Sequence, residues 1–475
     1  MNTTTKTNKI DKIKSFLNHP IDIAPLIYAR ITLGLLMTIE LCGGVLSPYG
    51  RTLITGDYHF SYSFAPFIKP WSEPIMMYIH FGVNFILGLM VVFGFKYRFA
   101  CIAMFFSATS IFLMEKTLYI NHVYLYCILF SVFAFLPANR AFSVDAHQNP
   151  QLKSSEIPAW TVYCIIFQLS IVYIYAGIAK LNIDWLHAQP MQIWLAAKKD
   201  HPVPYLGILL AHKYHAFLVA YGGIVFDLLV VPLMIWKKTR KVTFILAIFF
   251  HAINALTFGI GTFPWFSIAA TALFFPPSVF RNWWIFKYFD KQLPKKNTHF
   301  FQYSDKSKLY QNFVYSFFTL FFVVQFFLPW RAFFYGEDPS WTEQGHFFSW
   351  RMMLRTKRGI TTFKVSDAKS DKKEIAYPSV HLSYRQLRKM EKDPDMILQY
   401  VHFLEKIYKE EKGYIEPIIK VESEMSLNGR KKQSFIDSSV DLTKEKRSWR
   451  LYNWVTPLTE TEYIKKEDKN EDPND

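Results

Sequence analysis

A succession of long apolar segments is the feature that most restricts what this chain can fold into. A helix that crosses a bilayer needs roughly 20 apolar residues, and nine segments come close to that length. They cover residues 26–46, 74–95, 98–114, 119–137, 158–181, 215–236, 242–260, 264–277 and 311–329. Inside lipid each backbone polar group must be paired within the protein, so each segment is expected to be helical. The chain is therefore predicted to be an integral membrane protein in contact with a lipid bilayer.

The apolar residues are unevenly distributed along the chain. Hydrophobic residues make up 51% of the 475 residues, yet the C-terminal part is rich in Lys, Glu, Asp and Arg. We therefore predict a mainly α fold, a polytopic transmembrane helical bundle of about eight or nine spans followed by a small soluble α+β C-terminal domain. The expected divisions are an N-terminal polar segment over 1–24, the transmembrane domain with the active site over 25–330 and the soluble domain over 331–475.

The net charge of +16 is attributed to membrane topology. Lys and Arg flank the apolar segments instead of clustering among exposed aromatic residues on a soluble fold, which argues against nucleic acid as a partner. With the N-terminus inside, the basic connections at 96–98, 140–156, 237–241 and 287–308 all lie inside, as the positive-inside rule requires. An odd number of spans then places the C-terminal domain outside the cytoplasm.

The cysteines and the N-terminus bear on the host membrane. All four cysteines lie in or beside apolar segments, at Cys42, Cys101, Cys127 and Cys164. The first apolar segment has no signal-peptide cleavage site after it and is expected to be a retained span. Both features fit a bacterial inner membrane, and an endoplasmic reticulum membrane would fit them as well.

After the last apolar segment the sequence shows the patterns of a soluble domain. Asp393 and Pro394 offer an N-cap and a first-turn proline for an amphipathic helix that ends at Gly413. Strand-like runs at 415–427 and 434–440 flank an Asn-Gly pair, which predicts a β-hairpin.

Two ionisable residues at the ends of apolar segments are the main candidates for chemistry. A charge at the centre of a membrane helix costs ~2.5 to 3.5 kcal/mol, so such residues point to function. Lys180 either reaches to the interface beside Trp185 as a cation or is desolvated and uncharged, able to act as a general base. His122 is either a hydrogen-bonded residue at a helix end or a catalytic one. The expected topology places Asn121, His122 and Lys180 at one membrane level, which favours the catalytic interpretation.

Other polar residues have weaker patterns. His251 and Asn254 lie one turn apart and either face the site or make an interhelical hydrogen bond. Asp227 is expected to pair with a cation or with His251. The i, i+3 spacing of His212 and His215 lacks a third ligand for a metal. The arginine residues beyond the last span are expected to contact headgroups or an acidic partner: Arg351, Arg355 and Arg358.

Several of these segments carry a family resemblance. In order along the chain, six groups of residues resemble segments of vitamin K-dependent γ-glutamyl carboxylases, including the bacterial homologues called the horizontally transferred transmembrane domain family. The groups are 115–126, 176–185, 250–263, 325–329, 349–353 and 435–441. Ordered matches that include rare polar positions within membrane spans make the resemblance specific.

The resemblance implies a quinone-dependent reaction. The co-substrates would be vitamin K hydroquinone (reduced menaquinone or phylloquinone), dioxygen and carbon dioxide, with no metal, and quinol epoxidation would be coupled to carboxylation of a glutamate in a peptide or protein. Lys180 matches the catalytic lysine of the family and His122 a histidine that assists it. Asn121 matches a hydrogen-bond donor to the quinone, and we add His251, Asn254 and Tyr124 as quinone-binding residues.

Some family features are missing from this chain. It has no cysteine after Cys164 for the disulfide of vertebrate carboxylases, it has Ala179 before Lys180 where they have paired lysines, and it has Arg355 about where they have a histidine. These departures concern peptide recognition more than quinone chemistry. An epoxidase without peptide carboxylation, and a non-catalytic membrane receptor or transporter, are therefore kept as alternatives.

Overall fold

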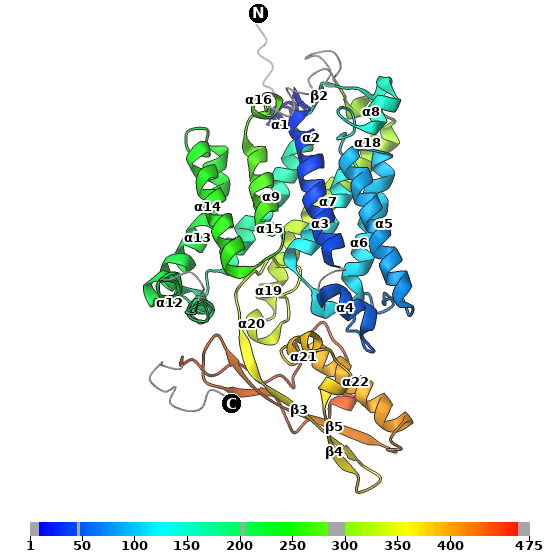
Figure 1. Ribbon diagram of the computed structural model, residues 1–475, viewed down its shortest axis with the longest axis vertical. Helices are drawn as coiled ribbons and strands as arrows, with labels where there is room; N and C mark the ends of the chain where they lie inside the picture. The colour runs from blue at the N-terminus through cyan, green and yellow to red at the C-terminus, as the bar shows by residue number, and fades with distance from the viewer. Residues whose placement is uncertain (1–8, 45–47, 201–204, 284–299, 464–475) are drawn as a thin grey trace, which may run out of the picture.

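The computed structural model describes residues 9–44, 48–200, 205–283 and 300–463. A bundle of long helices forms one part, and an α+β domain lies at one end of it (Figure 1). Helix α1 (Lys9–Asn18) and the turn between α13 and α14 lie at the opposite end from the α+β domain (Figure 1). Residues 1–8 of the expected polar segment and residues 287–299 of the basic connection at 287–308 lie outside the described residues.

Seven helices of the described chain are long and apolar enough to cross a membrane. The first span, Ala24–Gly43, is built from α2 (Ala24–Tyr28), a π-helical turn η1 (Ala29–Leu33) and α3 (Gly34–Gly43). The other six are α5 (Pro74–Phe93), α6 (Tyr97–Met114), α9 (Trp160–Ala179), α13 (Lys213–Ile235), α14 (Arg240–Phe258) and α18 (Lys308–Phe327), the last extended by η8 (Leu328–Trp330) and α19 (Arg331–Phe334). The predicted polytopic helical bundle is confirmed.

The nine expected segments are all helical, but two are too short to count as full spans. The fourth is α7 (Asn121–Phe133), and the eighth is α15 (Phe263–Thr271) with a 3-10 turn η5 (Ala272–Phe274). Helix α7 covers only 121–133 of the expected 119–137, because Ile120 is extended and the helix ends before Pro137. A 3-10 turn η3 (Lys116–Leu118), capped by Glu115, precedes it. The eighth lies between a glycine-containing connection and the two prolines Pro276 and Pro277.

Helix α9 is the centre of the bundle. Within its apolar window 72% of the residues are buried inside the protein, against 17% for α14, which has a largely exposed face. Residues at the end of α9 are therefore surrounded by other helices. The smaller helices are α4 (Pro48–Thr55), α8 (Val144–Gln148), α10 (Ile183–Leu186), α11 (Met191–Ala196), α12 (Leu206–Ala211), α16 (Pro277–Arg281) and α20 (Pro339–Thr342). The short strands β1 (Pro20–Asp22) and β2 (Glu156–Pro158) pair antiparallel at the end of the bundle near α1.

The C-terminal domain is a four-stranded antiparallel sheet packed against two helices. The strand order is β4-β3-β5-β6, formed by β3 (Lys357–Asp367), β4 (Lys373–Ala376), β5 (Pro417–Leu427) and β6 (Gln433–Ile436). The helices are α21 (Tyr384–Met390) and α22 (Pro394–Glu410). The side chain of Asp393 caps α22 by accepting from the Met396 amide at 3.2 Å, as the sequence predicts. The expected hairpin is also present, as β5 and β6.

Buried ionic contacts join the C-terminal domain to the helical bundle. The Nζ of Lys116, just after α6, lies 3.0 Å from Asp393 and 2.8 Å from Asp395 at the start of α22. Burial opposes the charge on Lys116, but the two carboxylates outweigh it and raise the pKa of the amine. The neighbouring Glu115 accepts from the side-chain amide of Gln386 on α21 at 3.1 Å. These contacts hold α21 and α22 close to the segment that precedes the N-terminus of α7.

A second junction lies close to the end of α9. Asp184 accepts from the side-chain amide of Asn428 at 2.7 Å and from Arg430 at 2.8 Å, and the Tyr463 hydroxyl also donates to it. Asn428 belongs to the turn between β5 and β6, with a φ of 52°. The hairpin of the C-terminal domain is therefore attached four residues after Lys180.

Candidate active site

One cavity of about 790 Å³ connects the interior of the helical bundle with the C-terminal domain. Apolar side chains line its membrane end, among them Leu169, Val172, Phe250, Phe258 and Phe263. Charged residues from segment 343–357 and from α21 line its outer end. The volume lies within the range of small-molecule sites, and the cavity is apolar at one end and charged at the other.

Lys180 lies at the membrane end of the cavity as the C-cap of α9, with 7% of its surface exposed. Its Nζ lies 2.7 Å from Oδ2 of Asp227 on α13 and 3.2 Å from the carbonyl oxygen of Ala176. It also lies 5.4 Å from the centre of the Trp185 ring. The sequence left open whether Lys180 reaches the interface or is desolvated, and the amine is buried beside a carboxylate. The expected pairing of Asp227 with a cation is confirmed, and the cation is Lys180.

Close packing of α9 on α13 brings the two partners together. A Cβ placed on Gly177 would lie 2.6 Å from Cδ2 of Leu228 and 3.3 Å from Cβ of Asp227. Small residues at helix interfaces in membranes allow such an approach. Gly177 therefore allows α9 and α13 to approach closely enough for Lys180 to reach Asp227.

His122 is the second residue of α7 and is held by a carboxylate from the first span. Its Nε2 lies 3.1 Å from Oε1 of Glu40, and the ring is stacked on Phe263 with centroids 5.5 Å apart. The other carboxylate oxygen of Glu40 accepts from the Thr262 amide at 2.8 Å. A Cβ on Gly261, whose φ is +62°, would lie 2.7 Å from both Glu40 oxygens. Glycine is therefore required there both by the backbone conformation and by the approach of Glu40.

Three of the four expected quinone-binding residues line the cavity. Asn121 accepts from the Tyr119 hydroxyl at 2.8 Å and lines the wall beside Arg351, whose carbonyl accepts from its amide at 3.4 Å. His251 makes a 2.8 Å hydrogen bond with the Tyr173 hydroxyl. Asn254 lines the cavity with no hydrogen-bond partner among the described residues.

Tyr124 is placed differently from the expectation. It faces away from the cavity, where the Gln325 amide donates to its hydroxyl at 2.8 Å and its ring packs 5.1 Å from Trp350. The physical reason is helical spacing, because Tyr124 lies two residues after His122 on α7 and so points to another side of the helix. His122 and Tyr124 cannot both face the same cavity wall.

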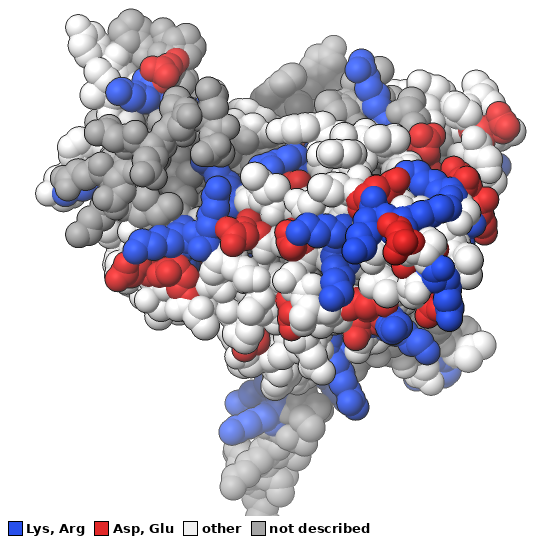
Figure 2. Space-filling model, turned by 90° about the horizontal axis from the view of Figure 1, so that it is seen from below, with Lys and Arg blue, Asp and Glu red and all other residues white. Residues whose placement is uncertain are grey.

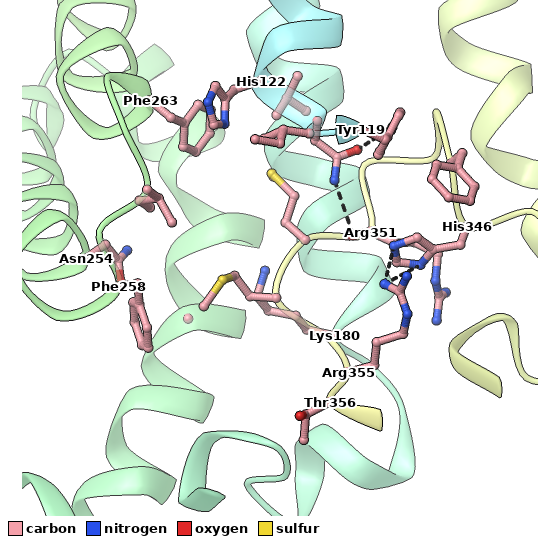
Figure 3. Close-up of a pocket in the computed structure, with 18 of the residues that line it drawn as sticks. Tyr119, His122, Lys180, Asn254, Phe258, Phe263, His346, Arg351, Arg355 and Thr356 are labelled. Atoms are coloured by element: carbon pink, nitrogen blue, oxygen red, sulfur yellow. Dashed lines mark hydrogen bonds between the residues drawn. The ribbon is translucent and has the colours of Figure 1, made fainter. Parts of the chain in front are cut away.

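The side chains converge on the cavity from separate elements. In Figure 3, Lys180 projects between Asn254 and Phe258 on one side and Arg355 and His346 on the other. His122 and Lys180 were expected to lie in one site, and both line this cavity.

The outer end of the cavity contains a buried ionic cluster that the sequence did not single out. Glu343 accepts from Nε of Arg355 at 2.7 Å and lies 2.9 Å from Nζ of Lys357. Burial opposes ionisation of Glu343, but the two cations outweigh it and lower the pKa of the carboxyl. Burial and the adjacent Arg355 lower the pKa of His346 well below its usual range, so that its imidazole is neutral. Arg351 and Arg355 thus face the cavity instead of lipid headgroups.

Of the two carboxylates that hold the site residues, the sequence analysis singled out Asp227 but not Glu40. Both lie inside apolar segments, and that rarity is itself a signal of function. Which cation pairs with Asp227, and that Glu40 contacts His122, depends on packing between helices. Among the described residues no group of three or more metal-ligating side chains includes His212 and His215.

Comparison with known protein families assigns both parts of the chain. Residues 18–279 match the HTTM domain, and residues 310–461 match the lumenal domain of vitamin K-dependent gamma-carboxylase. No solved structure matches the chain. The helical bundle, the attached sheet domain and the two matches agree in order and extent, so the chain belongs to the vitamin K-dependent gamma-carboxylase family and is an integral membrane, carboxylase-like protein.

Proposed function

We propose that this protein oxidises a vitamin K-type hydroquinone to its epoxide, with Lys180 as the base, and couples the reaction to carboxylation of a peptide glutamate. The observation that carries the proposal is the buried amine of Lys180, which lies in an apolar cavity and is bonded to Asp227 at 2.7 Å. A lysine that only reached for the interface would need neither the cavity nor a buried carboxylate.

The residues present fit a lipid-soluble quinone. The membrane end offers aromatic and aliphatic walls for a ring and its side chain, and the unpaired amide of Asn254 and the ring of His122 offer polar contacts to its oxygens. When bound, a reduced quinone supplies the electrons for reaction with dioxygen, and in the family scheme this produces the base strength needed to remove a γ-proton from glutamate. Carbon dioxide is then captured by the peptide carbanion.

The Lys180–Asp227 pair can hold and release a proton within the bundle. Desolvation penalises both charges of a buried pair, so moving the proton from the amine to the carboxylate costs less here than in water. In that form Lys180 is a neutral amine and can take a proton from a quinol hydroxyl. Asp227 is thus the second group that can hold the proton. The uncharged amine of Lys180 is one of the two protonation states of the pair.

His122 is proposed to assist through its hydrogen bond with Glu40. Glu40 fixes Nε2 of the imidazole, and among the described residues Nδ1 has no partner. A ring held in this way presents Nδ1 as its free nitrogen toward a bound ligand. The C-terminal domain, at the outer end of the cavity, is proposed to bring the peptide from the extracytoplasmic side of a bacterial inner membrane.

The test is an assay of purified protein in nanodiscs, with and without a glutamate peptide and labelled hydrogencarbonate. Lys180→Met is expected to abolish epoxide formation, at least about 100-fold, because general-base catalysis contributes about that much. Lys213→Met is the matched control, since Lys213 begins α13 away from the cavity. Epoxide formation unchanged in Lys180→Met would overturn the proposal. Epoxide without incorporated label would leave an epoxidase that lacks peptide carboxylation.

A further inference from the structure

The outer end of the cavity holds more cations than carboxylates. Eight basic side chains line it, against the carboxylates of Glu343 and Asp393. The basic residues are Lys116, Arg351, Arg355, Lys357, Arg385, Arg388, Lys389 and Lys392. The exterior of the C-terminal domain differs, because there basic and acidic side chains are interspersed (Figure 2). The excess of positive charge is therefore a local property of the cavity.

Two of these cations form no direct ion pair in the described chain, although carboxylates lie near them. Lys116 is neutralised by two carboxylates of α22, and Arg355 and Lys357 share Glu343. Lys389 on α21 and Lys392 just after it form no ion pair or hydrogen bond through their amines with any described residue. They lie three positions apart at the C-terminal end of a helix, where the helix dipole favours cations.

Like charges are crowded around both lysines. Burial and the proximity of Arg355 and Arg385 lower the pKa of Lys389 to about 8. Burial and the proximity of Arg388 and Lys389 lower the pKa of Lys392 to about 8. Lys389 nevertheless has surface open to the water of the cavity. Repulsion of this kind is relieved when an anion binds between the cations.

We infer that Lys389 and Lys392 bind acidic side chains of a peptide while a neighbouring glutamate of the same peptide reaches past Arg355 toward Lys180. The inference rests on the proposed function for the reacting glutamate. Gln386 holds α21 beside the cavity, and α21 belongs to the soluble domain. A peptide outside the membrane can therefore bring its carboxylates to the two lysines. The two lysines would then make the protein prefer peptides in which acidic residues are clustered.

Binding of labelled peptides to the full chain in nanodiscs of uncharged lipid tests the inference without any chemistry. The probes are a peptide with four clustered glutamates and one in which glutamine replaces all but one of them. Wild-type protein is expected to bind the clustered peptide at least about tenfold more tightly, because hydrogen bonds to charged groups are strong. The double variant K389Q/K392Q is expected to lose that preference, and K389R/K392R to keep it.

The matched control is K406Q/K420Q, which removes two exposed lysines of the same domain outside the cavity. It is expected to bind like wild type. Equal binding of the two peptides, or equal losses in both glutamine variants, would overturn the inference. Displacement of the peptide by hydrogencarbonate at equal concentration would overturn it too, since the site would then suit inorganic carbonate. The double variant K180M/D227L, which removes both charges of the buried pair, is expected to bind the peptide normally, which separates this result from failure of the proposed chemistry.

Discussion

The two ends of the cavity differ in whether their ionisable side chains have a partner within the protein. At the membrane end, Lys180 is paired with Asp227, and Glu40 is bonded to His122. At the outer end, Lys389 and the neighbouring Lys392 lack a carboxylate partner among the described residues. The difference follows from the surroundings, because an uncompensated charge within a membrane costs ~2.5 to 3.5 kcal/mol, whereas water reaches the outer end.

At the membrane end the protein itself supplies the partners of the charged side chains. At the outer end a ligand would have to supply them. Inside the bundle the proton-handling groups are already positioned, which is the condition for electrostatic preorganisation. At the outer end the fold leaves positive charge unneutralised, as expected of a site that receives an anion. Removing a charge should therefore have opposite consequences at the two ends.

The largest effect is expected from Asp227→Ala. Removing one partner of a buried ion pair leaves an uncompensated charge on Lys180 and should lower the free energy of unfolding by ~3 to 5 kcal/mol. Thermal unfolding of the purified protein in detergent measures this loss. Lys389→Gln is expected to leave the unfolding temperature unchanged or slightly higher, because it removes repulsion.

The double variant K180M/D227L provides the control for that prediction. It replaces both charges by apolar groups of similar size and should unfold close to wild type, although it is inactive. Equal destabilisation by Asp227→Ala and Lys389→Gln would remove the distinction between the two ends.

An intermediate effect is expected from Gly261→Ala. Left-handed backbone costs ~1 to 2 kcal/mol for a residue with a Cβ, and Gly259 (φ +58°) would bear the same cost without meeting any atom within 4 Å. Both alanine variants should therefore unfold at lower temperatures than wild type, and Gly261→Ala by more, because its Cβ also meets Glu40. Only Gly261→Ala should also slow epoxide formation, because its Cβ displaces Glu40 from His122. Equal activity in the two variants would show that this carboxylate does not position the ring.

Local patterns in the sequence were sufficient for much of the fold. The cap and spacing of α22, and the Asn-Gly turn between β5 and β6, are determined by residues close in sequence, and both were predicted. Strand β3 and helix α21 were missed, because β3 has a glycine and many charged residues, and its pairing with β5 is a long-range contact.

The candidate site was predictable only in part. Lys180 and His122 were found because polar residues in apolar segments are rare. Tyr124 lies close to His122 in sequence, but on a helix two residues this far apart do not share a face. Lys389 carried no signal, since an exposed lysine in a soluble helix is common until the fold places it against a cavity.

The smallest effect is the pH dependence of peptide binding at the outer end. With a pKa of about 8, each of Lys389 and Lys392 is mostly protonated at pH 7 and mostly neutral at pH 9. Anion binding is therefore supported most strongly at pH 7 and below and weakens as the pH rises through 8, by a few fold, since the bound anion itself raises both pKa values. The surrounding charged and titratable groups are Arg355, Arg385, Arg388, Glu343, Glu391, Asp393, His346 and Lys357.

The comparison with K389Q/K392Q isolates the contribution of the two lysines. Arginine stays charged across this range, and Lys357, whose pKa burial also lowers, is present in both proteins. The affinity of wild type for the clustered peptide should fall from pH 7 to pH 9, whereas that of the variant should change little. An equal fall in both would assign the titration to Lys357 or to the peptide. In either case the titration would not belong to Lys389 and Lys392, and the pH dependence would no longer distinguish the outer end by its unpaired lysines.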